Sequence, residues 1–389
     1  MKKLFIAVFM FVSTFTSNVL ADGHAIKMGV ILGFTGPIES LTPAMAASAE
    51  LAFKEASDSG ALLGGKTISV ERADSTCVDS AAATSAAEGL ISGGVVAIMG
   101  ADCSGVTGAI ASNVAVPKGV VMISPSATSP GLSTLDDNGY FFRTAPSDAR
   151  GGQILADITK DRGVKSVAIT YTNNDYGKGL ADVYEAAVKA HGIKVTTVAA
   201  HEDGKADYAA EVATLASAGG DAIAVIGYLD QGGKGIIQGS LDSGAFDTFI
   251  LSDGMIGDSL TDSFGKALNK SFGSIPGSTG KGAGVFSKVA KAAGIDSSGP
   301  YTGESYDAAA LITLAMQAGG KADRATVQKN VMSVANAPGT KIYPGQLKKA
   351  LDLLAKGKAV NYEGATGVEF TEVGEAKFFL FTPCFLSLG

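Results

Sequence analysis

Short apolar runs alternate with longer amphipathic stretches along the chain from Ile26 onward. Runs such as VVAIM and AIAVI are continuous and rich in β-branched residues, which is typical of parallel strands covered on both faces. Such runs predict strands at 27–32, 67–73, 95–100, 120–124, 167–171, 194–200, 222–228 and 248–252. Strand and helix patterns in alternation predict an α/β fold built of doubly wound parallel sheets.

Helix boundary signals stand between these runs. Thr42 and Pro43 predict an N-cap followed by a proline in the first turn, ahead of an alanine-rich stretch. Asp79 can cap the next helix, and two glycines at 93–94 end it. Further helices are predicted at 285–293, 303–318 and 323–335, a helical insertion at 345–357 and a strand pattern at 367–376.

The alternation occurs twice, which predicts two lobes. The first series ends near Arg143 and the second begins after Gly163, with no proline-rich or charged linker between them. We therefore expect short crossing strands between the lobes, with the glycine- and serine-rich stretch 271–284 as a loop and second crossing. The predicted division is 24–146 plus 275–360 for lobe I, and 147–274 plus 361–389 for lobe II.

The first residues have the pattern of an export signal. Two lysines precede an apolar run of about 12 residues, shorter than the roughly 20 that a membrane span needs. Val19-Leu20-Ala21 fits a signal-peptidase site, so residues 1–21 are predicted to be a signal peptide cleaved after Ala21. This pattern favours a periplasmic protein; a retained membrane anchor is the alternative.

Composition narrows the class of protein further. A chain of 389 residues is long enough for two domains, each with its own core. The formal net charge of −7 disfavours a nucleic-acid groove or an anionic membrane surface as partner. His24, His191 and His201 are far apart without ligand-like spacing, so we expect neither a metal site nor a cofactor.

The positions of the cysteines fit a protein that is exported to an oxidising compartment. Cys77 and Cys103 each follow a strand-like run and stand in turn-like contexts. In an oxidising compartment a disulfide between them is expected, with two free thiols as the alternative. Cys384 is left over.

Residues that follow strands are the candidates for ligand binding, because open α/β sheets bind ligands beyond the carboxyl ends of their strands. The third strand leads into Ser104, and the fourth leads into Ser126-Ala127-Thr128. Hydroxyls and free backbone amides at these places can hold a carboxylate without lysine or arginine. An ordinary N-cap or turn is the alternative for each.

In the second half of the chain, Tyr176, Tyr228 and Asp253 follow strands in the same way. A carboxylate there can pair with a ligand ammonium, and a tyrosine can form a wall of the cleft. The alternatives are a turn aspartate and half-buried tyrosines. No catalytic constellation is found: there is no G-x-S-x-G with a plausible histidine, and the P-loop pattern near Lys281 lacks its first glycine and its Ser/Thr.

The segments MGVILGFTGPIES, ISPSATSP, FFRTAPSD, NNDYGKGLADV and GPYTGESYDAAALI, together with Cys77 and Cys103, resemble the periplasmic leucine/isoleucine/valine-binding protein family. The resemblance covers essentially the whole chain after the signal peptide. These proteins are the receptors of ABC importers and have the type I periplasmic binding fold, in which two lobes close over a ligand about a three-stranded hinge.

The resemblance implies a role for each candidate residue. Ser104 and Thr128 would bind the ligand α-carboxylate, and a backbone carbonyl of Ser126 or Ala127 would accept from its ammonium. Asp253 would pair with that ammonium, where leucine-binding members have a glutamate. The second-lobe tyrosines that would close over the ligand are Tyr176 and Tyr228.

Two features depart from the family pattern. Leu41 stands where leucine-binding members have an aromatic wall of the side-chain pocket. The tail from Lys377, KFFLFTPCFLSLG, is almost wholly apolar where a polar-alternating strand is expected. A frameshift or truncation would explain it, and the last strand of the second lobe would then be absent, with Cys384 incidental.

Taken together, these features predict a monomeric periplasmic receptor for a neutral, aliphatic amino acid, which it delivers to an ABC permease and ATPase in the inner membrane. A receptor for an amide, urea or an aromatic carboxylate is the first alternative. An exported enzyme and a sensor module that feeds a signalling partner are alternatives of other classes.

Overall fold

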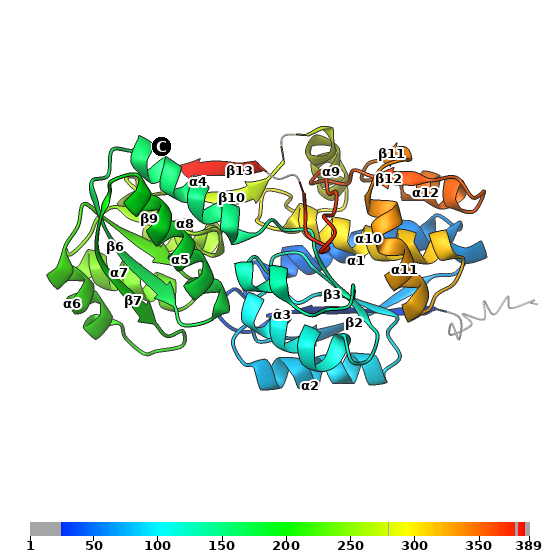
Figure 1. The fold of residues 1–389 in the computed structure, drawn as a ribbon, viewed down its shortest axis with the longest axis horizontal. Coiled ribbons are helices and arrows are strands. Elements are labelled where there is room, and N and C mark those ends of the chain that lie inside the picture. Colours follow the sequence, from blue (N-terminus) through cyan, green and yellow to red (C-terminus); the bar gives the residue numbers. More distant parts are fainter. Residues whose placement is uncertain (1–24, 279, 378–379, 386–389) are drawn as a thin grey trace, which may run out of the picture.

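The computed structural model describes residues 25–278, 280–377 and 380–385, and Figure 1 shows them as two α/β lobes. The sheet of the first lobe has the order β2-β1-β3-β4-β5, and its paired strands are all parallel. Its strands are β1 (Ile26–Leu32), β2 (Ile68–Asp74), β3 (Ala97–Gly100), β4 (Val121–Ser124) and β5 (Phe141–Arg143). The predicted α/β class is confirmed.

The sheet of the second lobe has the order β13-β10-β9-β8-β6-β7. Its strands are β6 (Ser166–Thr172), β7 (Lys194–His201), β8 (Ala222–Ile226), β9 (Phe249–Leu251), β10 (Phe272–Gly277) and β13 (Leu380–Phe385). All of its pairs are parallel except β10 with β13, which is antiparallel. Each of the eight strand ranges predicted from apolar runs overlaps an observed strand.

Helices cover both sheets, and several of them begin at a residue whose side chain caps the first turn, such as Asp79, Ser147, Asn174 and Asp323. The Asp79 carboxylate accepts from the amides of Ala81 and Ala82, as predicted, whereas Leu41 rather than Thr42 is the N-cap of α1. The helices up to the second crossing are α1 (Thr42–Asp58), α2 (Ser80–Ser92), α3 (Ser104–Ile110), α4 (Asp148–Asp161), α5 (Asp175–Ala190), α6 (Ala209–Ala218), α7 (Gly232–Ser243) and α8 (Asp258–Phe264).

The later helices return to the first lobe. They are α9 (Lys281–Ala292), α10 (Thr302–Gly319), α11 (Arg324–Ala335) and α12 (Leu347–Leu354), accompanied by the small sheet of β11 (Thr340–Ile342) and β12 (Val360–Tyr362). Helix α10 packs against α1 over the first sheet (Figure 1), and nearly all of its side chains are buried. The core of the first lobe is therefore completed by a helix that begins about 160 residues after the last strand of its sheet.

Two sequence predictions in the second lobe are wrong. The stretch 271–284 is not simply a loop, because Phe272–Gly277 forms β10 between β9 and β13. The last strand is not absent, because Leu380–Phe385 pairs with β10 along its length and is the red strand of Figure 1. Pairing on both sides holds the Gly- and Pro-containing segment extended, although its composition is typical of a turn.

The strand pattern predicted at 367–376 is also wrong, since the structure has only isolated bridges there, Arg143 with Glu375 and Phe370 with Ala376. The chain crosses between the lobes after β5, after β10 and again after Phe370. Tyr362 and Phe370 pack in the core of the first lobe. We therefore propose that lobe I extends beyond residue 360, to the crossing that leads into β13.

Candidate functional site

A small cavity lies between the lobes, at the carboxyl ends of strands from both sheets. It contains about 350 Å³ of empty space, including the part that opens to solvent. Its lining residues are Ile38, Leu41, Met45, Asp102, Cys103, Ser104, Ser126, Tyr176, Tyr228, Asp253, Gly254 and Tyr301. This is the place where parallel α/β sheets present loop side chains and free amides to a ligand.

The structure brings six of the eight predicted site residues to this cavity: Leu41, Ser104, Ser126, Tyr176, Tyr228 and Asp253. The other two, Ala127 and Thr128, are buried behind it. The Ala127 carbonyl accepts from the Arg143 guanidinium at 3.1 Å, and the Thr128 side chain lies beside the Asp148 carboxyl. The binding roles of the eight residues stay predictions.

The first-lobe wall is built on two short turns. The Ser104 hydroxyl accepts from the backbone amide of Ser129 at 3.1 Å, which leaves its own proton free to donate into the cavity. The Ser126 hydroxyl donates to the Asp102 carbonyl at 3.1 Å and so ties the two turns together. Both serines are therefore fixed before a ligand arrives.

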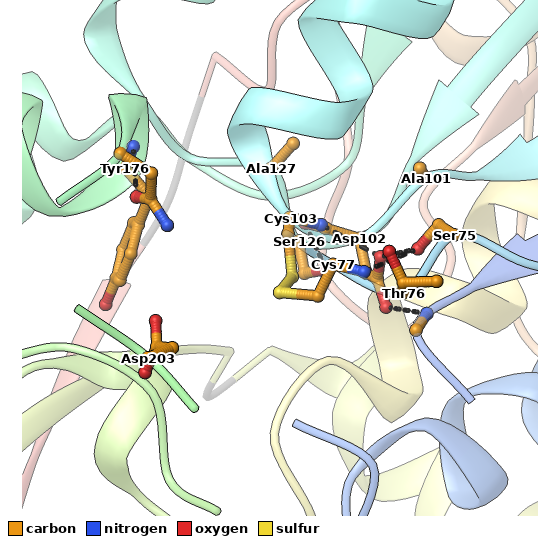
Figure 2. Close-up of a disulfide and its surroundings, with 12 residues drawn as sticks. Ser75, Thr76, Cys77, Ala101, Asp102, Cys103, Ser126, Ala127, Tyr176 and Asp203 are labelled. Atoms are coloured by element: carbon orange, nitrogen blue, oxygen red, sulfur yellow. Dashed lines mark hydrogen bonds between the residues drawn. A yellow bond between two sulfur atoms is a disulfide. The ribbon is translucent and has the colours of Figure 1, made fainter. Parts of the chain in front are cut away.

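The predicted disulfide is present and forms one edge of this wall. Cys77 and Cys103 are joined, and Figure 2 shows the bond next to Ser126, with Tyr176 on the opposite side. The neighbouring Asp102 carboxylate accepts from the Gly33 amide at 2.5 Å, the Ser75 hydroxyl at 2.9 Å and the Cys103 amide at 3.0 Å. Burial raises the pKa of Asp102, and these donors oppose the rise. They hold the ends of β1, β2 and β3 in register around the cavity.

The second-lobe wall consists of two tyrosines and Asp253. The rings of Tyr176 and Tyr228 stack, with centroids 5.1 Å apart and planes inclined by 16°. The Tyr176 hydroxyl donates to Asp253 Oδ1 at 2.6 Å and accepts from the Gly254 amide at 3.1 Å. The buried Tyr228 hydroxyl lies near Asn174 without a hydrogen bond of good geometry.

Tyr301 is a lining residue that the sequence analysis did not single out. It precedes α10 in the first lobe, and its hydroxyl donates to Asp253 Oδ2 in the second lobe. Both oxygens of one carboxylate thus accept from tyrosines, one from each lobe. The segment GPYTGESYDAAALI marked the family, but Tyr301 follows no strand, so the search at strand ends could not find it.

The charges of the cavity favour a ligand with a positive group. Asp102 and Asp253 are both lining residues, and the described lining contains no lysine, arginine or histidine. Burial raises the pKa of Asp253, while the hydroxyls of Tyr176 and Tyr301 oppose the rise by stabilising the carboxylate. A ligand that is only an anion would meet two carboxyl groups without a compensating cation.

A buried arginine supports the first-lobe wall from behind. The Arg143 side chain is fully buried, and its guanidinium donates to the carbonyls of Ala127 (3.1 Å) and Ser129 (2.8 Å) and to the Ser133 hydroxyl (2.9 Å). It also forms an ion pair with Glu375 in the third crossing. The turn that carries Ser126 is therefore fixed to one of the segments that link the lobes.

A buried carboxyl next to the first crossing gives a pH-dependent prediction. Burial raises the pKa of the Glu304 side chain in α10 to about 8, and the backbone carbonyl of Glu304 accepts from the Thr144 hydroxyl at 2.9 Å. The folded protein keeps this carboxyl protonated below that pH, whereas the unfolded chain ionises it above about 4.3. The contribution of Glu304 to stability is thus complete below pH 4.3 and is lost as the pH rises towards 8.

We therefore expect Glu304→Gln to change the pH dependence of the free energy of unfolding. The advantage of the variant over the original protein should grow by about 2 kcal/mol between pH 6 and pH 8. Urea denaturation at a series of pH values measures this. The exposed Glu372→Gln serves as control, and parallel stability profiles for the original protein and Glu304→Gln would contradict the prediction.

Two α/β lobes with a polar cavity between their strand ends define a two-lobed solute-binding protein. A family model described as periplasmic binding protein matches residues 25–349, and the chain belongs to this family. Among the described residues, no helix combines the length and apolarity of a membrane span. The described part of the chain also contains no group of three or more His, Cys, Asp or Glu that could hold a metal ion.

Two relatives of similar sequence support the assignment to this family. The Leu/Ile/Val-binding protein homolog 3 of Brucella melitensis is 31% identical over 220 residues, which are 56% of this chain and 58% of that relative. The Leu/Ile/Val-binding protein homolog 1 of the same organism is 30% identical over 82% of this chain and 84% of its own length. Both relatives are named as binding proteins, and the family to which the chain belongs consists of solute-binding proteins rather than enzymes.

Solved structures establish the same fold. The branched-chain amino acid transporter substrate-binding protein LivJ of Streptococcus pneumoniae, in complex with isoleucine, has a TM-score of 0.73 at 23% identity, over 90% of this chain and 93% of that one. An ABC transporter solute-binding protein of R. palustris in complex with 4-hydroxybenzoate has a TM-score of 0.68 at 19% identity, over 80% and 85%. The family is an exported, periplasmic one; the predicted signal peptide lies outside the described residues.

Proposed function

We propose that this protein binds a neutral amino acid with an aliphatic side chain in the cavity between its lobes. The observation that carries the proposal is that Ser104 of the first lobe and Asp253 of the second line the same small cavity. A hydroxyl donor on one lobe suits the α-carboxylate, and a buried carboxylate on the other suits the α-ammonium. Ile38, Leu41 and Met45 supply the apolar part of the lining.

In this proposal Tyr176 and Asp253 act mainly in the closed state. Their hydroxyl and carboxylate belong to the second lobe, and Ser104 and Ser126 belong to the first, so a zwitterion contacts both sets only when the lobes meet. A ligand can shift the equilibrium between open and closed forms only through contacts that differ between them. The closed form, as a monomer in the periplasm, would then deliver the amino acid to an ABC permease and its ATPase.

An aromatic carboxylate is the second candidate, supported by the 4-hydroxybenzoate complex of a protein with the same fold. The two carboxyl groups in the lining, Asp102 and Asp253, count against it because benzoate brings no cation. Burying a charge without a partner is costly. We therefore place the zwitterionic amino acid first.

A thermal-shift screen of residues 22–389 tests the proposal. Leucine, isoleucine, valine and alanine are compared with acetamide, urea and benzoate, each at millimolar concentration. A ligand at about 100 times its dissociation constant adds about 2.7 kcal/mol to the free energy of unfolding, which gives a clear rise in Tm. A rise with amino acids alone supports the proposal, and a rise only with benzoate or the amides overturns it.

A further inference from the structure

A second set of contacts joins the lobes outside the ligand cavity. Asp230 lies in the second lobe, just before α7, and is not among the cavity-lining residues. Its backbone amide donates to the Pro37 carbonyl at 2.8 Å, and its Oδ2 accepts from the Ser40 amide at 2.9 Å. Pro37 and Ser40 belong to the first-lobe turn between β1 and α1.

The Asp230 carboxylate is held in place by its own lobe. Its Oδ1 accepts from the Ser259 hydroxyl at 2.8 Å, and the Lys234 ammonium donates to that same hydroxyl oxygen at 2.9 Å. One carboxylate oxygen is thus used within the second lobe, and the other is presented to the first. Such prior positioning lowers the entropy cost of making the contact between lobes.

We infer that Asp230 is a closure latch, a positioning residue that stabilises the closed state without touching the ligand; the inference rests on the proposed binding function. The two hydrogen bonds of Asp230 to the turn at 37–40 require the lobes to be together, because their partners lie on different lobes. Truncating the side chain removes the bond to the Ser40 amide, leaves the backbone bond to Pro37, and lowers the fraction of binding-competent protein. The apparent dissociation constant is the intrinsic one divided by that fraction, so it rises equally for every ligand.

A residue that contacts the ligand side chain changes the affinities for leucine and alanine by different factors. The opening rate without ligand separates Asp230 from residues that contact the α-groups that both amino acids share. For Asp230→Ala we expect leucine and alanine to bind about tenfold more weakly, by the same factor for both, given the loss of a charge-assisted hydrogen bond. Asp230→Asn keeps one acceptor for the Ser40 amide. Its affinities for both amino acids should therefore lie between those of the parent protein and those of Asp230→Ala.

Calorimetric titration with leucine and alanine measures the affinities, and single-molecule FRET measures the motion of the lobes without ligand. Dyes on Lys349→Cys in α12 and Asp182→Cys in α5, in a Cys384→Ser background, report the distance between lobes. Asp230→Ala should open about tenfold faster from the closed state. Asp262→Asn, an exposed acid on α8 with no hydrogen bond to the first lobe among the described residues, is the matched control and should behave like the parent.

The outcomes separate the latch from the proposed function. An unchanged opening rate in Asp230→Ala, or unequal losses for leucine and alanine, overturns the latch. If neither amino acid binds the original protein, the proposed function fails, while the FRET measurement still decides the latch. If Asp230→Ala does not fold, the same comparison is made with Asp230→Asn, where a faster opening rate supports the inference and an unchanged one overturns it.

Discussion

Asp253→Asn should weaken the binding of an aliphatic amino acid by at least about 30-fold, while the free energy of unfolding stays equal or rises. The carboxylate is the acidic group that the proposal assigns to the ligand ammonium. Removing one partner of a buried, hydrogen-bonded charge pair costs about 2–5 kcal/mol of binding. An amide cannot offer two acceptors to Tyr176 and Tyr301 together with a negative charge to the ligand.

The free energy of unfolding should stay equal or rise, because burial in the folded protein disfavours the charged form of Asp253 and raises its pKa. Replacing it by a neutral isostere removes that cost in the ligand-free protein. Calorimetric titration with leucine and urea denaturation without ligand measure the two quantities. Asp148→Asn is the matched control: the Asp148 carboxyl is buried nearby, and burial together with the charge of Asp253 raises its pKa, but it does not line the cavity.

The two results together make the assignment falsifiable. A variant that keeps leucine affinity within about twofold would remove Asp253 as the ammonium partner. Equal losses for Asp253→Asn and Asp148→Asn would mean that the charge of the region, rather than a direct contact, governs binding.

Arg143→Ala should lower the free energy of unfolding by about 3–5 kcal/mol, the range for a buried ion pair that loses one partner. The guanidinium has four acceptors, and Glu375 among them is mostly buried. The substitution leaves this carboxylate and two backbone carbonyls without their donor. Ligand affinity should fall as well, because the turn that carries Ser126 loses its attachment to the third crossing.

Urea denaturation followed by circular dichroism checks the stability of Arg143→Ala. The exposed Arg150→Ala, at the start of α4, should change the free energy of unfolding by less than about 0.5 kcal/mol. Adding Glu375→Gln to Arg143→Ala should restore part of the loss, since no uncompensated charge then stays buried. A single variant as stable as the parent would show that Arg143 is not a structural anchor.

Several strands of both lobes, such as β3, β4 and β8, could be predicted because their apolar runs are nearly uninterrupted, and parallel strands covered on both faces require this. The same reasoning failed for β10, since the sequence FGSIPG has turn composition and becomes a strand only through its neighbours β9 and β13. It failed for β13 because an apolar tail looked foreign to the family. Both segments are strands because they pair with partners that are distant in the sequence.

The residues of the candidate site also fall into two groups, those that the sequence predicts and those that it does not. Ser104, Ser126, Tyr176, Tyr228 and Asp253 were predictable, because the carboxyl ends of parallel strands meet at one edge of a sheet. Arg143 and Tyr301 were not assigned a role, although both stand in segments that marked the family. Their partners Glu375 and Asp253 lie 232 and 48 residues away, and no local pattern records such contacts.

The burial of α10 has a consequence for how the protein is made. The first sheet is complete by residue 143, but the helix that covers it beside α1 begins only at Thr302. A nascent chain that has yielded β1 to β5 therefore still exposes one apolar face of that sheet. Folding dominated by such distant contacts is slow. This delay would keep the chain unfolded long enough for a translocation channel, which threads extended polypeptide, to accept it before the first lobe can close on itself.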